Sequence, residues 1–513
     1  MLKTFVLAVF SVAVVLTIAH LVFRPPSLAG RTISKAVTAS SDTPLGKLAL
    51  NAKAGASSGV VPLLDGPGAF AARIALIRKA EAALDVQYYI WQRDATGLIL
   101  LNELRQAAER GVRVRLLLDD NGIIDLDEDL AGLNEEPNFE VRLFNPFVFR
   151  QIKELGYVFD FVRLNRRMHN KSLTADGAVS ILGGRNIGDV YFGFPGDLQF
   201  IDTDVMVTGK VAADVGADFD RYWQSGSAHP IANIVARSEA GALQRLVADA
   251  LRAAKSDDGK RYFRTMATSK LVRELLAGEL AFEWTEVTLV SDDPAKGLGK
   301  AKDRDLLFPQ LLSLLSTPTH SVDLVSAYFI PGKAFKSRLQ QLADKGIRVR
   351  ILTNSQAATD VALVHSSYVK YRAGLLASGI ELYELKPEYS VTDEPDTQGL
   401  YSSRASLHSK TLAVDENRIF IGSFNFDPRS VFLNTEMGVV IDSPRLAKNL
   451  ADAFVERFPN ASYQPVLTQE GAIVWDEAEA KGATGRHETE PRTTPASRLA
   501  LWIYGLFPIE WLL

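Results

Sequence analysis

The sequence contains no cysteine, and this absence excludes several kinds of chemistry. A chain without cysteine forms no disulfide bond, has no thiol nucleophile or lipid-bearing cysteine, and has no cysteine-ligated metal site. Histidine is also scarce, with seven residues in the chain, and no group of His, Asp and Glu has the spacing of a metal site. We therefore expect a protein that works without a metal ion and without a cofactor.

Neither sign of charge dominates the sequence. The formal net charge is -4 and the pI is about 6.1, so the molecule as a whole does not attract nucleic acid, and a polyanion would need a local basic groove. We expect no nucleic-acid partner. The 47% share of hydrophobic residues is that of a globular protein, and 513 residues are enough for two or three domains.

An apolar run marks the N-terminus. It extends from Thr4 to Phe23 with basic residues on both sides, and it is long enough to span a bilayer as a helix. We predict that residues 1–29 form an N-terminal anchor, whereas cleavage after Ala29 would make this segment a signal peptide. Residues 30–59 are small and polar, which is typical of a tether.

One polar pattern occurs twice in the chain. In each copy a His is followed by Lys, Asp, Gly and Asn at the same offsets. Two copies of the full pattern arise by chance with a probability on the order of one in 10⁴ or less at average residue frequencies. The pattern therefore indicates a functional site built from two related halves: His169, Lys171, Asp176, Gly183 and Asn186 in the first, and His408, Lys410, Asp415, Gly422 and Asn425 in the second.

Each copy of the pattern predicts a hairpin. Residues two apart in a strand share a face, so His169 and Lys171 project side by side, as do their counterparts in the second copy. Asp176 lies in a turn, after which the returning strand brings Asn186 back opposite His169. Asp176 is five strand residues beyond Lys171, roughly 17 Å along the strand. We therefore expect Asp176 and Asp415 to support the turns and not to contact the same substrate atom.

Two His, two Lys and two Asn side chains, brought together across a pseudo-two-fold axis, would form a pocket for one tetrahedral anion. Two positive charges suit a phosphoryl group and stabilise its oxygens without a metal. One imidazole can attack phosphorus while the other protonates the leaving alkoxide. The attacking imidazole needs an acceptor at its other nitrogen. Asp202 and Glu436 follow the two motifs at similar distances and are our candidates for that role.

The pattern of strands and helices is also duplicated. Strands that alternate with helices predict an α/β fold of layered sheets. The expected elements are a strand at 85–91, a helix at 98–110 and a strand at 112–118, followed later by a strand at 321–330, a helix at 334–345 and a strand at 347–352. The predicted divisions are a first domain at 60–231, a helical connector at 232–290 and a second domain at 291–467.

The end of the chain changes character twice. Residues 468–497 are charged and rich in Gly, Pro and Thr, which predicts a flexible linker. The tail at 498–513 is apolar, and its aromatic side chains favour a membrane interface, with Glu510 facing the headgroups. These aromatic residues are Trp502, Tyr504 and Trp511. The alternative is a tail docked on the core of the protein.

These motifs resemble the phospholipase D superfamily, and most closely the bacterial cardiolipin synthases of the C type. The resemblance runs from residue 60 to residue 460 and includes RLNRRMHNKSLTADG, GGRNIGDVYF, TNSQAATDVALVHSSY and GSFNFDPRSVFLNTEMG. It implies two duplicated phospholipase D-like α/β/α sandwich domains, packed as a pseudo-two-fold bilobal unit. It also implies a phosphohistidine intermediate formed without a metal, with His169 as the nucleophile and His408 as the general acid. The phosphate ligands that it implies are Lys171, Lys410, Asn186 and Asn425.

The two motifs differ at one position. Motif one has Gly184 where motif two has Ser423. We therefore expect a hydroxyl contact to phosphate from one half only.

The resemblance implies transfer of a phosphatidyl group from a donor phospholipid to His169, and then to the glycerol hydroxyl of phosphatidylglycerol. It implies a protein of a bacterial inner membrane. The N-terminal apolar run, and not the resemblance, predicts the anchor, and we expect the catalytic body outside the cytoplasm. One alternative is a hydrolase, either a phospholipase D or a phosphodiesterase of nucleic acid, in which water completes the second step. The other is an inactive lipid-binding scaffold. The acidic pI and apolar ends argue against a nuclease, and the intact motifs argue against a scaffold. The sequence identifies no partner protein.

Overall fold

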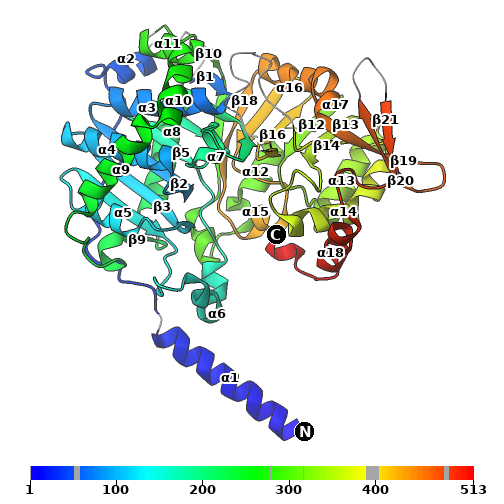
Figure 1. Cartoon of the computed structure of the whole chain (residues 1–513), viewed down its shortest axis with the longest axis horizontal. Coiled ribbons are helices and arrows are strands. Elements are labelled where there is room, and N and C mark those ends of the chain that lie inside the picture. Colours follow the sequence, from blue (N-terminus) through cyan, green and yellow to red (C-terminus); the bar gives the residue numbers. More distant parts are fainter. Residues whose placement is uncertain are drawn as a thin grey trace.

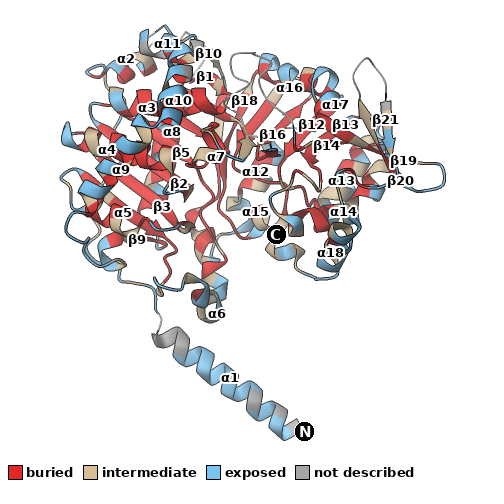
Figure 2. Ribbon diagram, viewed as in Figure 1, coloured by how far each residue is buried: buried red, intermediate tan, exposed pale blue. Residues whose placement is uncertain are grey.

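The computed structural model describes residues 2–22, 24–50, 58–277, 279–315, 317–388, 404–478 and 484–513. Its body consists of two halves that lie side by side, each built around a mixed β-sheet with helices on its faces (Figure 1). Buried residues concentrate in the two sheets and along the seam between them (Figure 2). The predicted α/β class with two duplicated domains is confirmed.

The first half contains a nine-stranded sheet with the order β10-β1-β8-β6-β5-β2-β3-β4-β9. β2, β3 and β4 are parallel, and the other neighbours are antiparallel. The strands are β1 (Ser58–Leu63), β2 (Ala83–Trp91), β3 (Arg113–Ile123), β4 (Phe139–Phe144), β5 (Ser172–Ala175), β6 (Val179–Gly183), β8 (Asp204–Gly209), β9 (Ala228–Pro230) and β10 (Glu283–Thr285). The helices are α3 (Gly66–Lys79), α4 (Ala95–Glu109), α5 (Asp127–Asn134), α6 (Lys153–Leu164), α7 (Asp189–Phe192) and α8 (Lys210–Trp223).

Local sequence explains why α4 and β3 form where they do. The Asp94 side chain caps α4 by accepting a hydrogen bond from Gly97 N at 3.0 Å. Gly111, at φ +95°, adopts a conformation that favours glycine and ends the helix. The apolar run that follows is buried on both faces of the sheet, as is typical of a central parallel strand.

The second half contains a ten-stranded sheet with the order β11-β18-β17-β16-β12-β13-β14-β19-β20-β21. Its central six strands repeat the β8-β6-β5-β2-β3-β4 order of the first sheet, including the three parallel strands. The strands are β11 (Val287–Ser291), β12 (Ser321–Ser326), β13 (Arg348–Asn354), β14 (Glu381–Leu385), β16 (Lys410–Val414), β17 (Arg418–Gly422), β18 (Met437–Asp442), β19 (Ser462–Leu467), β20 (Ile473–Ala478) and β21 (Thr484–His487). The helices are α12 (Leu307–Leu314), α13 (Gly332–Asp344), α14 (Ala362–Leu376), α15 (Pro428–Phe432), α16 (Pro444–Glu456) and α17 (Phe458–Ala461).

The two halves share a hydrophobic core. One cluster of buried side chains combines Val60, Leu182 and Val207 from the first half with Ile421 and Val439 from the second. A two-stranded parallel sheet of β7 (Leu198–Ile201) and β15 (Arg404–Leu407) also joins the halves. Burial of this shared apolar surface fixes their relative position, which the active site depends on.

The predicted connector is helical. It contains α9 (Ala242–Lys255), α10 (Asp257–Thr268) and α11 (Lys270–Ala277). Its last residues form β10, which pairs with β1 of the first sheet, and the start of β11, which pairs with β18 of the second. Short 3₁₀ helices complete the central part of the chain: η1 (Ile231–Asn233), η2 (Pro294–Leu298) and η3 (Asp303–Asp305).

Two segments that the sequence predicts to be flexible pack on the body, and those predictions are wrong for the described residues. In the expected tether, Arg31 donates to the carbonyl oxygen of Ser225 at 2.7 Å, and α2 (Pro44–Leu50) follows. In the expected linker, β20 and β21 extend the second sheet. Hydrogen bonds of the β-sheet and polar side-chain contacts fix these segments on the body, although their composition alone indicates flexibility. Residues 51–57 and 479–483 of these two segments lie outside the described residues.

The N-terminal helix α1 (Leu2–Val22) extends away from the body (Figure 1). Among the residues that the structure describes, no helix combines the length and apolarity that crossing a membrane requires. The anchor at residues 1–29 stays a prediction.

The C-terminal tail is docked on the second half and still exposes aromatic side chains. It forms α18 (Pro495–Gly505) and the 3₁₀ helix η6 (Glu510–Leu512), and Leu501 is buried. Glu510 accepts hydrogen bonds from Lys370 at 2.9 Å and from the Tyr371 hydroxyl at 2.6 Å. The expectation that Glu510 faces headgroups is therefore wrong, because its carboxylate pairs with α14. Trp502 and Trp511 remain 63% and 55% exposed.

Candidate active site

The two repeated motifs form hairpins, and their Asp residues lie in the turns. β5 pairs with β6 and β16 pairs with β17, both antiparallel. Asp176 and Asp415 have φ values of +54° and +53°, a left-handed conformation that Asp tolerates in turns. The Asp176 carboxylate accepts hydrogen bonds from the backbone N–H groups of 81–83, and the Asp415 carboxylate accepts them from those of 319–321. Each carboxylate thus ties its turn to the start of the neighbouring strand.

His169 is held by two consecutive residues of the other half. Its backbone N–H donates to the carbonyl oxygen of Thr435 at 2.8 Å, and its Nδ1 lies 2.8 Å from Glu436 Oε2. His169 is 6% exposed and Glu436 is fully buried. The first motif therefore depends on the second half to fix the plane of its imidazole.

His408 is held in the same way by the first half. Its backbone N–H donates to the carbonyl oxygen of Ile201 at 2.8 Å, and its Nδ1 lies 2.5 Å from Asp202 Oδ2. His408 is 5% exposed. Asp202 and Glu436, the predicted partners, thus contact the two imidazoles, and each contact crosses between the halves.

Gly184 and Ser423 occupy matching positions, and each accommodates its own carboxylate. A Cβ at Gly184 would lie 2.1 Å from Asp202 Oδ1, so any larger residue would displace Asp202. The Ser423 hydroxyl donates to Glu436 Oε2 at 2.5 Å and accepts from Met437 N at 3.0 Å. The Ser423 hydroxyl proton is directed at Glu436 in this arrangement, and the expected hydroxyl contact to phosphate stays a prediction.

Both lysines are buried beside the imidazoles. Lys171 Nζ donates to the carbonyl oxygen of His169 at 2.7 Å, and Lys410 Nζ donates to the carbonyl oxygen of His408. Burial lowers the pKa of Lys171 to about 7, with Glu436 opposing that shift. Burial also lowers the pKa of Lys410, with carboxylates opposing. The site therefore carries up to two positive charges that a bound anion would stabilise.

The two imidazoles are neutral near pH 7. Burial lowers the pKa of His169 well below its usual value, and both lysines lower it further. Burial and Lys410 lower the pKa of His408 to about 4, against the opposing effect of Asp202. Because Nδ1 of each ring faces a carboxylate, Nδ1 carries the proton and Nε2 keeps its free lone pair.

The two carboxylates differ in pKa. Burial raises the pKa of Glu436 to about 7, although Lys171 opposes the shift. Burial also acts to raise the pKa of Asp202, but Lys410 and His408 outweigh it, and the pKa is lowered. Asp202 is therefore the permanently ionised partner, while Glu436 titrates near neutral pH.

The two Asn residues of the motifs have different surroundings. Asn186 Oδ1 accepts from Ile90 N at 3.1 Å, and Asn186 Nδ2 donates to the Tyr191 hydroxyl at 2.9 Å. The side-chain oxygen of Asn425 is buried and makes no hydrogen bond to the described residues. Asn425 is therefore free to turn its amide toward a bound group.

Aromatic side chains surround both imidazoles. Tyr89 lies 5.0 Å from the His169 ring, and Tyr191 and Phe200 lie 5.2 and 5.1 Å from the His408 ring, measured between centroids. Tyr191 and Phe200 are not among the predicted site residues. The sequence does give a signal for Tyr191, since it lies five residues after Asn186, the last residue of motif one. Phe200 has none, because only its pairing with β15 brings it to His408.

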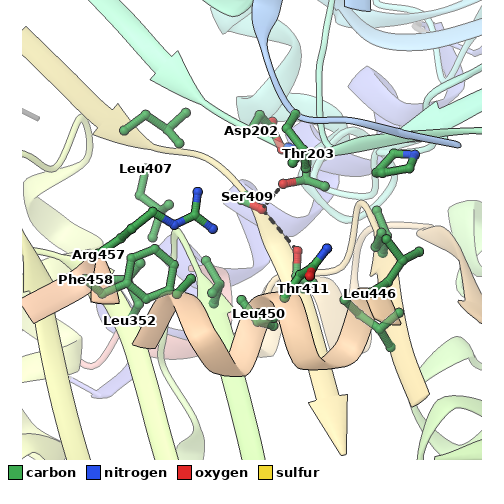
Figure 3. Close-up of a pocket in the computed structure, with 18 of the residues that line it drawn as sticks. Asp202, Thr203, Leu352, Leu407, Ser409, Thr411, Leu446, Leu450, Arg457 and Phe458 are labelled. Carbon is green, nitrogen blue, oxygen red and sulfur yellow. Dashed lines mark hydrogen bonds between the residues drawn. The ribbon is translucent and has the colours of Figure 1, made fainter. Parts of the chain in front are cut away.

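A mainly apolar pocket of about 160 Å³ lies against Asp202 where the halves meet. Ser409 Oγ donates to Thr203 Oγ1 at 2.9 Å and lies 3.2 Å from Thr411 Oγ1, so hydroxyl groups of both halves gather beside Asp202 (Figure 3). Apolar side chains, mainly leucine, isoleucine and valine, line most of the remaining wall. Apolar surroundings strengthen the electrostatic interaction between Asp202 and His408. Within the described ranges, no group of three His, Asp or Glu side chains is placed to hold a metal ion.

Comparisons with known proteins identify relatives of this chain. A family model described as "Cardiolipin synthase, PLD-like domain" matches residues 74–223 and 311–458, one match in each half. Cardiolipin synthase C of Escherichia coli K12 is 46% identical over 458 residues, which are 89% of this chain and 96% of that protein. Cardiolipin synthase 2 of Staphylococcus epidermidis RP62A is 26% identical over 381 residues, which are 74% of this chain and 64% of that protein.

A solved structure shares the fold. The crystal structure of phosphatidylserine synthase from Haemophilus influenzae Rd KW20 aligns with a TM-score of 0.55 and 13% sequence identity, covering 91% of this chain and 99% of that one. At this identity the likeness concerns the fold alone. The matches in both halves and the near full-length relative show that the chain belongs to the cardiolipin synthase family of phospholipase D-like proteins.

Proposed function

We propose that the protein is a cardiolipin synthase that transfers a phosphatidyl group between phospholipids through a phosphohistidine. The observation that carries the proposal is that each imidazole contacts a carboxylate of the other half, His169 with Glu436 and His408 with Asp202. Two buried lysines lie beside these pairs. Two imidazoles with free Nε2 atoms, each beside a buried lysine, match the needs of a phosphoryl transfer in two displacements.

In the first displacement, the Nε2 lone pair of His169 attacks the phosphorus of a donor phospholipid. The P–O bond to the headgroup alcohol breaks, and the leaving oxygen takes a proton from His408 Nε2. Lys171 and Lys410 stabilise the charge that develops on the phosphate oxygens. His408 needs that proton before the step, and a phosphate anion bound beside it favours the protonated ring.

In the second displacement, the glycerol hydroxyl of phosphatidylglycerol is the acceptor. His408 Nε2 takes the hydroxyl proton, the oxygen attacks phosphorus, and the P–N bond to His169 breaks. The product is cardiolipin, with retained configuration at phosphorus because two inversions occur. Asp202 stabilises the imidazolium of His408 in both steps, as an ionised carboxylate does in other catalytic triads.

The alternative product is phosphatidic acid, formed when water replaces the acceptor lipid. Both His side chains are less than a tenth exposed, and Tyr89, Tyr191 and Phe200 cover their rings. Exclusion of water from the phosphohistidine favours transfer over hydrolysis. From the relatives we infer that the substrates are phospholipids, with phosphatidylglycerol as the acceptor. From the relatives and the apolar ends of the chain we infer a bacterial membrane location with an N-terminal anchor.

Product analysis tests the proposal. The purified full chain is incubated with vesicles in which phosphatidylglycerol carries one isotope label and phosphatidylethanolamine another, and the lipids are identified by mass spectrometry. We expect labelled cardiolipin, and the label of its phosphatidyl groups identifies the donor. Phosphatidic acid as the sole labelled product would identify a hydrolase, and no product at all would favour a lipid-binding scaffold.

A further inference from the structure

Helix α6, which is kinked at Asp160, exposes large apolar side chains on both sides of the kink, just before motif one. Leu155, Val158, Phe161 and Val162 are 42%, 61%, 40% and 74% exposed, whereas Gly156 and Leu164 of the same helix are buried. Contiguous exposed apolar side chains on a soluble body mark a site for a partner or a membrane. No part of the proposed reaction uses these side chains directly.

The apolar surface of α6 continues onto the second half and the C-terminal turn. The Phe161 ring lies 6.4 Å from the ring of Trp511 in η6. Arg166 donates to the carbonyl oxygen of Phe432, whose side chain is 62% exposed. Arg429 donates to Leu512 O at 2.7 Å and to the Asn165 side chain at 2.6 Å, which ties η6 to the end of α6. We call the combined set of Leu155, Val158, Phe161, Val162, Phe432 and Trp511 the α6 surface.

The α6 surface is linked to the His169 side of the active site by a short chain of contacts. The Tyr157 hydroxyl of α6 donates to Asn121 Oδ1 at 2.8 Å, and Asn121 Nδ2 donates to the Tyr89 hydroxyl at 3.3 Å. The Tyr89 ring lies against His169. A hollow of about 400 Å³ opens beside Tyr89 and Asn121, with Ile124 on its rim. The element that exposes apolar side chains therefore also positions a residue beside the nucleophile.

The chemistry of the surface favours a bilayer over a protein partner. It combines aliphatic side chains with Trp511 and Phe432, and such side chains enter the boundary between headgroups and acyl chains. The exposed tail helix α18 and the N-terminal helix α1 lie on this same side of the body (Figures 1 and 2). If the protein acts on phospholipids as proposed, the acyl chains of the substrate stay in the lipid phase, so the reacting phosphodiester stays at the level of the headgroups. The site must therefore meet the bilayer at an apolar surface close to His169.

We propose that the α6 surface docks on a phospholipid bilayer and inserts Val158 and Val162 below the headgroups. This inference rests on the proposed function for the identity of the lipid substrate, and it adds the element that contacts the lipid phase. Docking at α6 places the donor headgroup next to Tyr89 and His169.

The absence of cysteine allows a direct test on the full chain. A single cysteine is introduced by Val158→Cys and labelled with a polarity-sensitive fluorophore, and Val455→Cys is the matched control. Val455 is 68% exposed on α16, in a helix that lies at the opposite side of the body (Figure 1). Vesicles of phosphatidylglycerol and phosphatidylethanolamine are then added. We expect the fluorescence emission maximum to shift to the blue at position 158 and to stay unchanged at position 455. This difference between the two positions is expected even if another segment of the chain also binds the vesicle. Equal spectra at the two positions would overturn the proposal.

Activity separates docking from chemistry. Val158→Asp together with Val162→Asp should lower turnover of vesicle lipids about tenfold, because charges replace two valines that enter the lipid phase on docking. The same variant should leave turnover of a soluble short-chain phosphodiester within about twofold. Val455→Asp should change neither rate. Equal losses on both substrates in a variant with wild-type thermal unfolding would contradict the proposal. A wild-type enzyme that docks at Val158 and only hydrolyses its lipid would contradict the proposed function instead.

Discussion

His169 and His408 occupy matching positions but have unequal partners. Asp202 stays ionised beside His408, whereas burial raises the pKa of Glu436, the partner of His169, to about 7. An ionised carboxylate stabilises the imidazolium that a general acid and base passes through. Glu436, whose carboxylate has a pKa near neutrality, can take up the Nδ1 proton of His169 as Nε2 bonds to phosphorus, so the phosphohistidine need not hold a full positive charge. The inequality agrees with nucleophile and acid roles for His169 and His408, respectively.

The pH dependence of kcat/KM should be bell-shaped around neutrality. The charge of Lys171 is lost as the pH rises through about 7, and the carboxylate of Glu436 is lost as the pH falls through about 7. Catalysis needs the charged form of Lys171 and the ionised form of Glu436, so kcat/KM declines at pH values above and below the optimum. The two apparent pKa values belong to the coupled pair. Lys171→Arg keeps its charge and should move the alkaline limb to higher pH. An unchanged alkaline limb in that variant would assign the limb to another group.

Removal of one active-site lysine should lower kcat/KM far more than treatment with a metal chelator. Lys171→Ala should lower kcat/KM on the order of 10²-fold or more, as loss of one charge-stabilising donor does elsewhere. Lys210→Ala, which removes an exposed ion pair with Asp214, is the control and should leave the rate unchanged. A chelator should have little effect on the wild-type enzyme. Full inactivation by the chelator, reversed by one divalent ion, would contradict phosphate binding by lysines alone.

Gly184 has a specific steric role. Gly184→Ala should displace Asp202, since the added Cβ would lie 2.1 Å from its carboxylate oxygen. Because Asp202 orients His408, kcat should drop at least about tenfold by analogy with outer-shell substitutions, while circular dichroism stays that of the wild type. Gly196→Ala, where the nearest atom is 3.8 Å away, is the matched control. Wild-type kcat in Gly184→Ala would show that the position of Asp202 does not limit the reaction.

At the scale of elements, the turn residue Asp176 should matter for folding and not for chemistry. Its carboxylate is buried and accepts hydrogen bonds from three backbone N–H groups at the start of β2. Asp176→Ala leaves these donors unpaired and should lower the free energy of unfolding by about 2–4 kcal/mol. Asp214→Ala, at an exposed position, should change it by less than about 0.5 kcal/mol. Urea denaturation measures both, and a loss of activity in folded Asp176→Ala enzyme would contradict a purely supporting role.

Elements with a strong local pattern are predictable from the sequence. The hairpins follow from turn residues at fixed offsets, and α4 and β3 follow from a helix stop followed by an apolar run. β20 and β21 are not predictable in this way, because their stability comes from pairing with β19 and from Trp475 donating to the buried Glu384 at 2.9 Å. The exposed apolar face of α6 is also missed, since the segments that surround it are distant in the sequence.

At the scale of the whole molecule, the central feature is that neither half holds a complete site. Duplication predicts that the motifs meet, and the spacing of Asp202 and Glu436 behind the motifs suggests a backing role. The exchange of partners between the halves cannot be predicted from sequence, because it depends on how β7 pairs with β15 and how the shared core packs. The same packing brings Phe200 to His408, which no local pattern indicates.

The most direct measurement of the central claim is the identity of the residue that carries the phosphatidyl group. A phosphatidyl donor with a good leaving group needs no general acid for the first displacement. With this donor, His408→Ala should accumulate a covalent adduct, located at His169 by peptide mass spectrometry, and His169→Ala should form none. His320→Ala, at an exposed His outside both motifs, should behave as the wild type. An adduct at His408 in the His169→Ala variant, with none in His408→Ala, would contradict the assignment of the nucleophile.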